Sequence, residues 1–231
     1  MTTERKALLL IGSAKPTGQS SSEALGTYLL EQVAGHGFSS ATYHLHQVLR
    51  TRQRLQGLLT AVDQADLLIL ACPLYVDSLP YLVTNALELI AAHRQAQNAP
   101  RPCHFVAILN CGFPEAQHND TALAICGQFA RQAHLVWQGG LALGQGGTIG
   151  GRPLPQLGGM VRSIMQALDL TATALAQGQP VPAQAAALMA KPLMPNFFYT
   201  LMAHLGWRMQ ARRQGKWGHL QDQPFVEQGQ P

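Results

Sequence analysis

The sequence predicts a doubly wound α/β domain with a five-stranded parallel sheet of order 2-1-3-4-5, followed by a C-terminal helical extension. Strand and helix patterns alternate from residue 7 to about residue 177, as in parallel strands joined by crossover helices. Two segments, 67–72 and 103–110, are nearly continuous apolar runs, which is typical of strands buried on both faces. Because the composition changes after residue 179, we expect a domain at 1–179 and an extension at 180–231.

Each expected element has its own local pattern. Short apolar segments bounded by glycine, proline and polar residues predict strands at 7–11, 38–44, 67–72, 103–110 and 135–143. Apolar residues spaced three and four apart predict helices at 22–34, 82–90, 122–133 and 160–175. In a sheet of this order a ligand crevice lies at the carboxyl ends of the first and third strands. The loops after strands one, three and four are therefore expected to meet there.

Composition limits the classes of protein that fit. The 231 residues can bury one full core, and 47% hydrophobic residues against 12% charged excludes a disordered chain. There is no apolar run long enough for a bilayer, and the chain enters its first strand without a signal-peptide pattern, so we expect a cytoplasmic protein. The net charge of +4 comes without a recognised nucleic-acid module, so no nucleic-acid partner is expected. The cysteines form no C-x-x-C pair, and His44 and His46, taken to share a strand face, lack a third ligand, so no metal is expected.

The loop after the first strand predicts an anion site. It runs from Gly12 through Lys15 to a helix pattern, and backbone N–H groups and the helix dipole favour a phosphate at such a point. Hydroxyl donors come from Ser13, Thr17, Ser20, Ser21 and Ser22. Gln19 follows Gly18 where a nucleotide-hydrolysing P-loop needs lysine, and no three-glycine dinucleotide fingerprint is present. One terminal phosphate remains as the expected ligand, and a serine-rich helix cap that binds nothing is the alternative.

The loops after strands three and four have the composition of a pocket for a flat ring. Pro73, Leu74, Tyr75, Val76 and Asp77 combine a proline-fixed backbone with aromatic and aliphatic side chains, which suits an isoalloxazine ring. Asn110, Cys111 and Gly112 could complete this pocket, with Gly112 permitting close approach of the backbone. Alternatively, Tyr75 only covers the end of the sheet. The glycine-rich segment 144–151 is either a lid on the same rim or a plain connector.

These motifs carry a family resemblance over residues 5–177. Gly12-Ser13-x-Lys15 with the three serines at 20–22, and Cys72-Pro73-Leu74-Tyr75-x-x-x-Leu79-Pro80, resemble the phosphate and ring loops of flavodoxin-like NADPH-dependent FMN reductases and NAD(P)H:quinone oxidoreductases. The resemblance implies a flavodoxin-like fold, non-covalent FMN, NAD(P)H as co-substrate, and a homodimer or tetramer. It also implies hydride transfer from a nicotinamide through flavin N5 to a quinone, a flavin or a similar small-molecule electron acceptor.

The resemblance assigns roles to individual residues. It implies that the FMN phosphate is held by Ser13, Lys15, Ser20, Ser21 and Ser22, in a loop shaped by Thr17 and Gly18. It implies that the ring is held by Pro73, Leu74, Tyr75, Val76, Asn110, Cys111 and Gly112. Lys15 stands where many relatives have arginine, and Asp77 places a negative charge near the ring. His118, on the loop after strand four, is the candidate proton donor, because histidine exchanges protons near neutral pH; an ordinary surface histidine is the alternative.

The extension contains one further helix pattern. Its apolar residues are Phe197, Phe198, Leu201, Met202, Leu205 and Met209. Arg208, Arg212, Arg213 and Lys216 make its far end basic. Packing on its own domain, a partner subunit and peripheral contact with an anionic membrane surface are all open. Two other functions are also open for the whole chain: a flavodoxin-like electron carrier, which its pI of about 9.0 disfavours, and a flavin-free binding or regulatory module.

Overall fold

Five parallel strands form one sheet in the order β2-β1-β3-β4-β5, so the predicted flavodoxin-like topology is confirmed. This computed structural model describes residues 5–97 and 100–222. Neighbouring strands pair in parallel, with Ala7 beside Leu67 and Leu67 beside His104. The strands are β1 (Arg5–Ile11), β2 (Phe38–His44), β3 (Leu67–Pro73), β4 (His104–Asn110) and β5 (Val136–Leu143).

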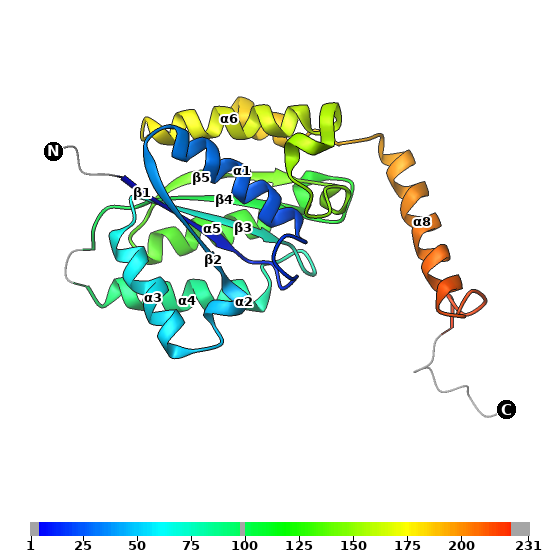
Figure 1. Cartoon of the computed structure of the whole chain (residues 1–231), viewed down its shortest axis with the longest axis horizontal. Helices are drawn as coiled ribbons and strands as arrows, with labels where there is room; N and C mark the ends of the chain where they lie inside the picture. Colours follow the sequence, from blue (N-terminus) through cyan, green and yellow to red (C-terminus); the bar gives the residue numbers. More distant parts are fainter. Residues whose placement is uncertain (1–4, 98–99, 223–231) are drawn as a thin grey trace. The chain divides into compact units, whose positions relative to one another are not determined.

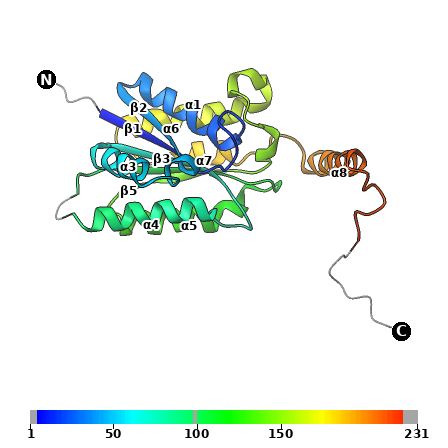
Figure 2. The ribbon, with the colours of Figure 1, turned by 60° about the horizontal axis from the view of Figure 1, so that its bottom comes forward.

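Alternation along the strands sends side chains to two separate cores. Leu8 and Leu10 of β1 join one apolar cluster, whereas Leu9 and Ile11 join the other. One face is covered by α2 (Leu45–Val48), α3 (Arg52–Gln64), α4 (Tyr81–Gln95) and α5 (Asp120–Gln132). The other face is covered by α1 (Ser21–Gly35), α6 (Arg162–Ala176) and α7 (Ala183–Met189). Figures 1 and 2 show these two helical layers with the sheet between them.

The sequence analysis gave no helix between the second and third strands. The structure has two there, α2 and α3, and Leu55, Leu58, Leu59 and Val62 provide the three-and-four spacing that marks the longer one. The helix α3 begins where the Thr51 side chain accepts a hydrogen bond from the Arg54 backbone N–H at 3.3 Å.

The open edge of the sheet at β5 is protected. Gly139 has φ +99°, and the register of β4 and β5 shifts nearby between Phe105 and Ala107, so the strand is irregular at this point. The Val181 N–H donates to Gln138 O at 2.7 Å, and the α7 residues Ala185 and Met189 are buried in the domain core. This cover prevents the edge from pairing with another strand.

Contacts divide the chain into two compact units, residues 1–193 and 194–231. The segment with α7 therefore lies in the first unit, and the expected division of function at residue 180 stays a prediction. The second unit contains α8 (Asn196–Arg213). Within the described ranges 5–97 and 100–222, no helix is both long and apolar enough to span a bilayer.

All the parallel strands end at the same edge of the sheet, so the loops that follow them gather there. Two of these loops contain 3₁₀ turns: the loop after β4 has η1 (Ala116–Asn119), and the segment after β5 has η2 (Gly146–Thr148) and η3 (Leu154–Val161). The loop after β1 leads into α1, and the loop after β3 leads into α4. This edge holds every residue that the sequence analysis assigned to phosphate, ring or proton transfer.

At the amino ends of the strands, a buried arginine holds neighbouring segments together. The fully buried Arg94 guanidinium donates to three backbone carbonyls: from Nε to Ala133 O at 2.7 Å, and from one terminal nitrogen to Arg101 O at 2.9 Å and His134 O at 3.2 Å. One side chain on α4 thus connects the segments that lead into β4 and β5.

Replacing Arg94 by methionine should therefore destabilise the fold. Arg94→Met keeps an apolar stem but leaves three carbonyls without their donor, which should lower the free energy of unfolding by about 2–4 kcal/mol. Urea unfolding followed by circular dichroism measures this change. Arg131→Met, at an exposed position on α5, is the matched control, and equal stability of the two variants would contradict the role of Arg94.

Candidate functional site

Buried hydrogen bonds join the loops at the carboxyl edge. The Ser21 hydroxyl, in the first turn of α1, donates to Gly146 O at 2.6 Å and accepts from the Gly150 N–H at 3.3 Å. The start of α1 is therefore fixed to the loop after β5, although 125 residues separate Ser21 from Gly146. A buried hydroxyl that both donates and accepts contributes to the position of both segments.

Asn110 makes the corresponding connection between the central strands. Its side-chain amide donates to the Ser22 hydroxyl at 2.8 Å and to Cys72 O at 3.2 Å. Its backbone carbonyl accepts from the Leu74 N–H at 2.9 Å. Asn110 and Ser22 are buried, so these bonds lie out of water and hold β4, the β3 loop and α1 in one arrangement.

The glycine-rich loop after β5 packs directly on the predicted anion loop. A Cβ atom added to Gly151, which has φ +82°, would lie 2.7 Å from Gln19 Cα and from Gly18 O. Only glycine permits this approach. Gln145 and Gly146 of the same loop are buried, so segment 144–151 forms a wall of the site.

Hydroxyl groups of the anion loop are engaged within the protein. Ser20 caps α1 by accepting from the Glu23 N–H at 3.1 Å, and Ser13 accepts from the Lys15 N–H at 3.3 Å. Together with the bonds of Ser21 and Ser22, this engages all four serine hydroxyls. The backbone N–H groups of Ser21 and Ser22 have no acceptor within their helix, because they belong to its first turn. The candidate anion donors are therefore the backbone amides of the helix start together with the hydroxyls of Ser13, Ser20 and Ser22, which act only as acceptors in these bonds.

A carboxylate that the sequence analysis missed, Glu23, lies in the first turn of α1 and bonds back to this loop. Glu23 Oε2 accepts from the Gly18 N–H at 2.7 Å, and Oε1 lies 3.5 Å from His44 Nε2. The Ser20-x-x-Glu23 spacing is the signal of a capping box and could have identified this residue. Glu23 uses one of the amides that an anion would use, and it places a negative charge beside the others.

The short helix α2 contacts the loop that follows β1. His46 Nδ1 lies 3.3 Å from Ser13 O, and Gln47 Nε2 donates to the Thr17 hydroxyl at 3.5 Å. The expectation that His44 and His46 share a strand face is wrong, because β2 ends at His44 and His46 lies in α2. Their rings still meet edge to face, with centroids 5.7 Å apart. The Lys15 side chain is exposed on the outside of the loop.

The loop after β3 is a tight turn with a strained tip. Tyr75 and Ser78 exchange backbone hydrogen bonds of 3.0 and 3.2 Å, and both residues between them have positive φ: 52° for Val76 and 54° for Asp77. This is the pattern of a type I′ turn, which a β-branched residue such as valine rarely adopts. Tyr75 is 51% exposed and Val76 is 99% exposed. The amides of Val76 and Asp77 lie outside the two hydrogen bonds of the turn.

Cys111 supports the loop after β4 from within. Its thiol lies 3.5 Å from Glu115 O and accepts from the Asn119 side-chain amide at 3.5 Å. Burial raises the pKa of the Cys111 thiol, and hydrogen bonds only partly offset this effect. Its backbone N–H and carbonyl bond to Leu143 and Gly146. A Cβ atom added to the next residue, Gly112, would meet nothing within 4 Å, so the space in front of the loop is open.

His118 and Asp77 face each other across the rim. The His118 ring stacks on Phe113 with centroids 4.3 Å apart. Its Nδ1 lies 3.5 Å from Asp77 Oδ1, and its Nε2 lies 3.8 Å from Glu115 Oε2. The Asp77 carboxylate is therefore directed toward the β4 loop, and all three polar side chains remain accessible to water.

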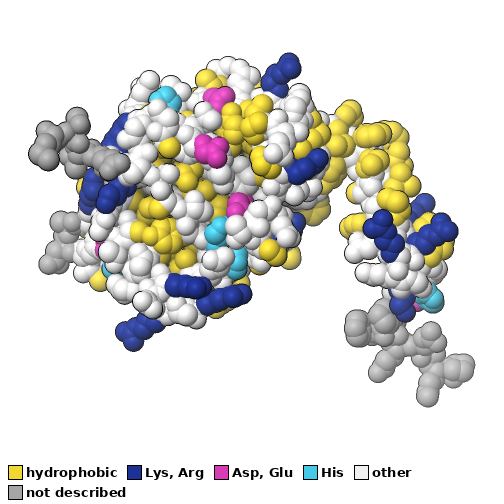
Figure 3. All heavy atoms as spheres, in the orientation of Figure 1, with side chains coloured by type: hydrophobic (Ala, Val, Ile, Leu, Met, Phe, Trp, Pro, Cys, Tyr) yellow, Lys and Arg dark blue, Asp and Glu magenta, His cyan; other side chains and the backbone are white. Residues whose placement is uncertain are grey.

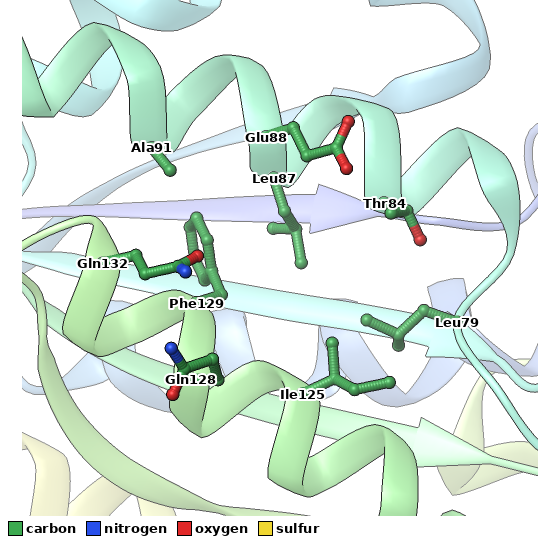
Figure 4. A pocket seen from close by; sticks show the side chains of 9 residues that line it. All are labelled: Leu79, Thr84, Leu87, Glu88, Ala91, Ile125, Gln128, Phe129 and Gln132. Atoms are coloured by element: carbon green, nitrogen blue, oxygen red, sulfur yellow. The ribbon is translucent and has the colours of Figure 1, made fainter.

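A separate groove lies away from this edge, between α4 and α5. It has a volume of about 150 Å³ and is lined mainly by apolar side chains, among them Leu87, Ile125 and Phe129. Figure 4 shows these side chains converging from the two helices, with Glu88 and Gln128 at the margin. Apart from Leu79, its lining residues belong to the two helices, so this groove is not part of the candidate site.

The residues at the carboxyl edge fit a ligand with a phosphate and a flat ring. A helix N-terminus supplies amides and a positive dipole end for the phosphate. The Tyr75–Ser78 turn supplies an exposed aromatic ring and backbone amides, next to open space at Gly112. The fold defines a flavodoxin-like domain, and these loops lie together at the carboxyl ends of its strands.

Comparisons with solved structures support this class. The chain is similar to an NADH:FMN oxidoreductase in its apo form, with a TM-score of 0.56 and 15% identity over 83% of this chain and 96% of that one. It is also similar to an NAD(P)H:quinone oxidoreductase from Methanothermobacter marburgensis, with a TM-score of 0.54 and 12% identity over 75% and 96% of the two chains.

A third similar structure is a much longer protein, the rubredoxin oxygen:oxidoreductase from Desulfovibrio gigas. The TM-score is 0.55 and the identity 11%, and the match covers 82% of this chain but only 38% of that one. No protein-family model and no curated protein matches the sequence. At 11–15% identity, these likenesses establish the flavodoxin-like fold.

Burial of the cysteines leads to a prediction about their reactivity. Burial raises the pKa of Cys111, and it raises the pKa of Cys103 and Cys126 to about 12 and that of Cys72 well above its usual range. A raised pKa leaves little reactive thiolate near neutral pH. In the folded protein, iodoacetamide at pH 8 should therefore modify all four thiols slowly.

Mass spectrometry of the intact protein over time measures this labelling. A Thr60→Cys variant places a thiol at an exposed position and should gain one rapid adduct, and protein unfolded in urea should react at all four native cysteines. Rapid labelling that maps to Cys111 in the folded wild-type protein would show that its thiol is accessible and ionised, against this structure.

Proposed function

We propose that this chain is an FMN-dependent NAD(P)H oxidoreductase that reduces a quinone, a flavin or a similar small acceptor. The observation that carries this proposal is that the start of α1, at Ser21 and Ser22, lies close to the exposed Tyr75–Ser78 turn. Asn110 bonds both to Ser22 and to Leu74, which precedes the turn, and so fixes the arrangement of the two segments. The flavodoxin-like fold and the similarity to an NADH:FMN oxidoreductase and an NAD(P)H:quinone oxidoreductase support the proposal.

FMN, when bound, would supply hydride transfer between a nicotinamide and the acceptor. The backbone amides of Ser21 and Ser22 would bind its phosphate, with Lys15 as a flexible point charge at the entrance. Pro73, Leu74, Tyr75 and Val76 would orient the ring, and the amides at Val76 and Asp77 would bind its polar edge. Asn110 and Cys111 would hold these loops from behind, and Gly112 would leave room for the ring.

His118 would donate the proton that quinone reduction requires. Its imidazole lies at the rim, where an acceptor could approach it, and Phe113 and Asp77 limit its orientation. The proposal includes a homodimer or tetramer, as the family resemblance implies.

Glu23 favours a second candidate, a flavodoxin-like binding module without flavin. Its carboxylate already bonds the Gly18 amide and adds negative charge to the anion loop. If this charge prevents phosphate binding, the fold would serve another ligand. Measurement of FMN binding decides between the two candidates.

FMN binding and its reduction test the proposal. We expect purified protein to quench FMN fluorescence saturably, and NADH or NADPH to bleach the bound flavin without oxygen. Glu23→Gln keeps an acceptor for the Gly18 N–H but removes the charge, so it should bind FMN about three to ten times more tightly. Titration of flavin fluorescence measures both affinities.

Glu31→Gln is the matched control, since it removes an exposed carboxylate two turns further along α1 and should leave the affinity unchanged. Failure of both the wild-type protein and Glu23→Gln to bind FMN would reject the oxidoreductase. FMN binding without bleaching by either nicotinamide would instead favour an electron carrier.

His118→Gln tests the proton donor. Between about pH 5 and 8 the variant should reduce quinone more slowly than the wild-type protein, because glutamine has no acidic proton to donate. At pH 6 we expect the variant to turn over at least about tenfold more slowly. Stopped-flow absorbance separates this step from flavin reduction by the nicotinamide, which should be unchanged.

His36→Gln, at the far end of α1, is the control for loss of an exposed histidine. Equal quinone turnover by His118→Gln and wild type across this pH range would remove the proton-donor role and leave the flavin assignment intact.

A further inference from the structure

The second compact unit exposes a helix that is rich in large apolar side chains. Described by itself, α8 has 18 residues, and Ala211 is the one residue in it that is buried. Its exposed large apolar residues are Phe197, Phe198, Leu201, Met202, Leu205, Trp207 and Met209. Trp217 and Leu220, just beyond the helix, are exposed as well. An exposed surface of this kind marks an interaction site.

Within α8 itself the charged side chains are all basic, and they lie toward its C-terminal end. Arg208, Arg212, Arg213 and Lys216 are exposed, and residues 196–213 contain neither aspartate nor glutamate. Figure 3 shows apolar side chains along the first part of α8 and basic side chains on its last part. Arg208 and Arg212 follow Leu201 and Leu205 by seven residues, so they continue the same face. Polarity therefore changes along the helix axis more than around it.

We propose that α8 binds the surface of an anionic phospholipid membrane. Its apolar part would enter the boundary between headgroups and acyl chains, and its four cations would contact lipid phosphates. Trp207 and Trp217 combine an apolar body with one N–H donor, which suits this boundary. Among the described residues no helix can span a bilayer, so the contact is peripheral.

Charge argues against a second copy of this chain as the occupant. The first unit carries 12 lysine and arginine residues against 10 acidic residues, so it offers no net negative surface to the basic end of α8. Two α8 helices packed in parallel would bring six cations into proximity without a carboxylate from either helix. Nucleic acid would satisfy the cations but would leave the row of exposed phenylalanine, leucine and methionine side chains in water.

Sedimentation of the full chain with vesicles tests the proposal. We expect the protein to sediment with vesicles of phosphatidylcholine and phosphatidylglycerol at about 0.1 M salt, and much less with phosphatidylcholine alone. Changing Arg208, Arg212, Arg213 and Lys216 to glutamine should lower the partition coefficient at least about tenfold. Changing Phe197, Leu201 and Leu205 to serine should lower it similarly, because apolar burial is lost.

The matched control changes Arg50, Arg52, Arg54 and Arg131 to glutamine, which removes the same charge from exposed positions of the first unit and should leave binding unchanged. Circular dichroism establishes that each variant is folded. Protein that stays in the supernatant with anionic vesicles overturns the proposal, as does equal loss of binding in the control. Sedimentation velocity without lipid adds a second readout: a dimer that only the α8 variants abolish would assign the helix to a second copy.

Discussion

The candidate site depends on the buried side-chain amide of Asn110. This one group, at the end of β4, donates to the Ser22 hydroxyl in the first turn of α1 and to the backbone carbonyl of Cys72 near the end of β3. Its backbone carbonyl holds Leu74 as well. Because these bonds lie in a region of low dielectric, each is strong when made and costly when lost. The helix start and the Tyr75–Ser78 turn consequently keep a fixed spacing.

Around this neutral interior, charge is confined to the rim. Lys15, Glu23, Asp77 and His118 lie on the loops around the site or next to them, and none of them belongs to the buried network. In the proposed site, the backbone amides of the helix start would contact an anion, and the nearby charges would adjust its affinity. Glu23 would then weaken phosphate binding through its negative charge.

The sequence predicted the sheet order and the edge where the site lies, because apolar runs and loop composition are local signals. It could not predict what Ser21 and Ser22 do: both serines are proper phosphate donors by type, but their partners, Gly146 and Asn110, are 125 and 88 residues away. The direction of the Asp77 side chain could not be predicted either. It depends on a turn with two residues at positive φ, and neither of these residues is glycine. By contrast, the capping-box spacing of Ser20 and Glu23 and the apolar spacing in α3 were local and readable.

The long sequence separations within the site have a consequence for folding. The start of α1 and the segment near Gly150 are neighbours in space, so the loop that follows β1 cannot acquire its final shape until nearly the whole sheet has formed. Bringing such distant segments together costs chain entropy, and the contacts that offset this cost form only late in folding. Parallel sheets of this kind are therefore slow to fold. A ligand bound by all these loops recognises the completed domain and no shorter intermediate. Such a ligand would therefore stabilise the native state by mass action, in proportion to the logarithm of its concentration.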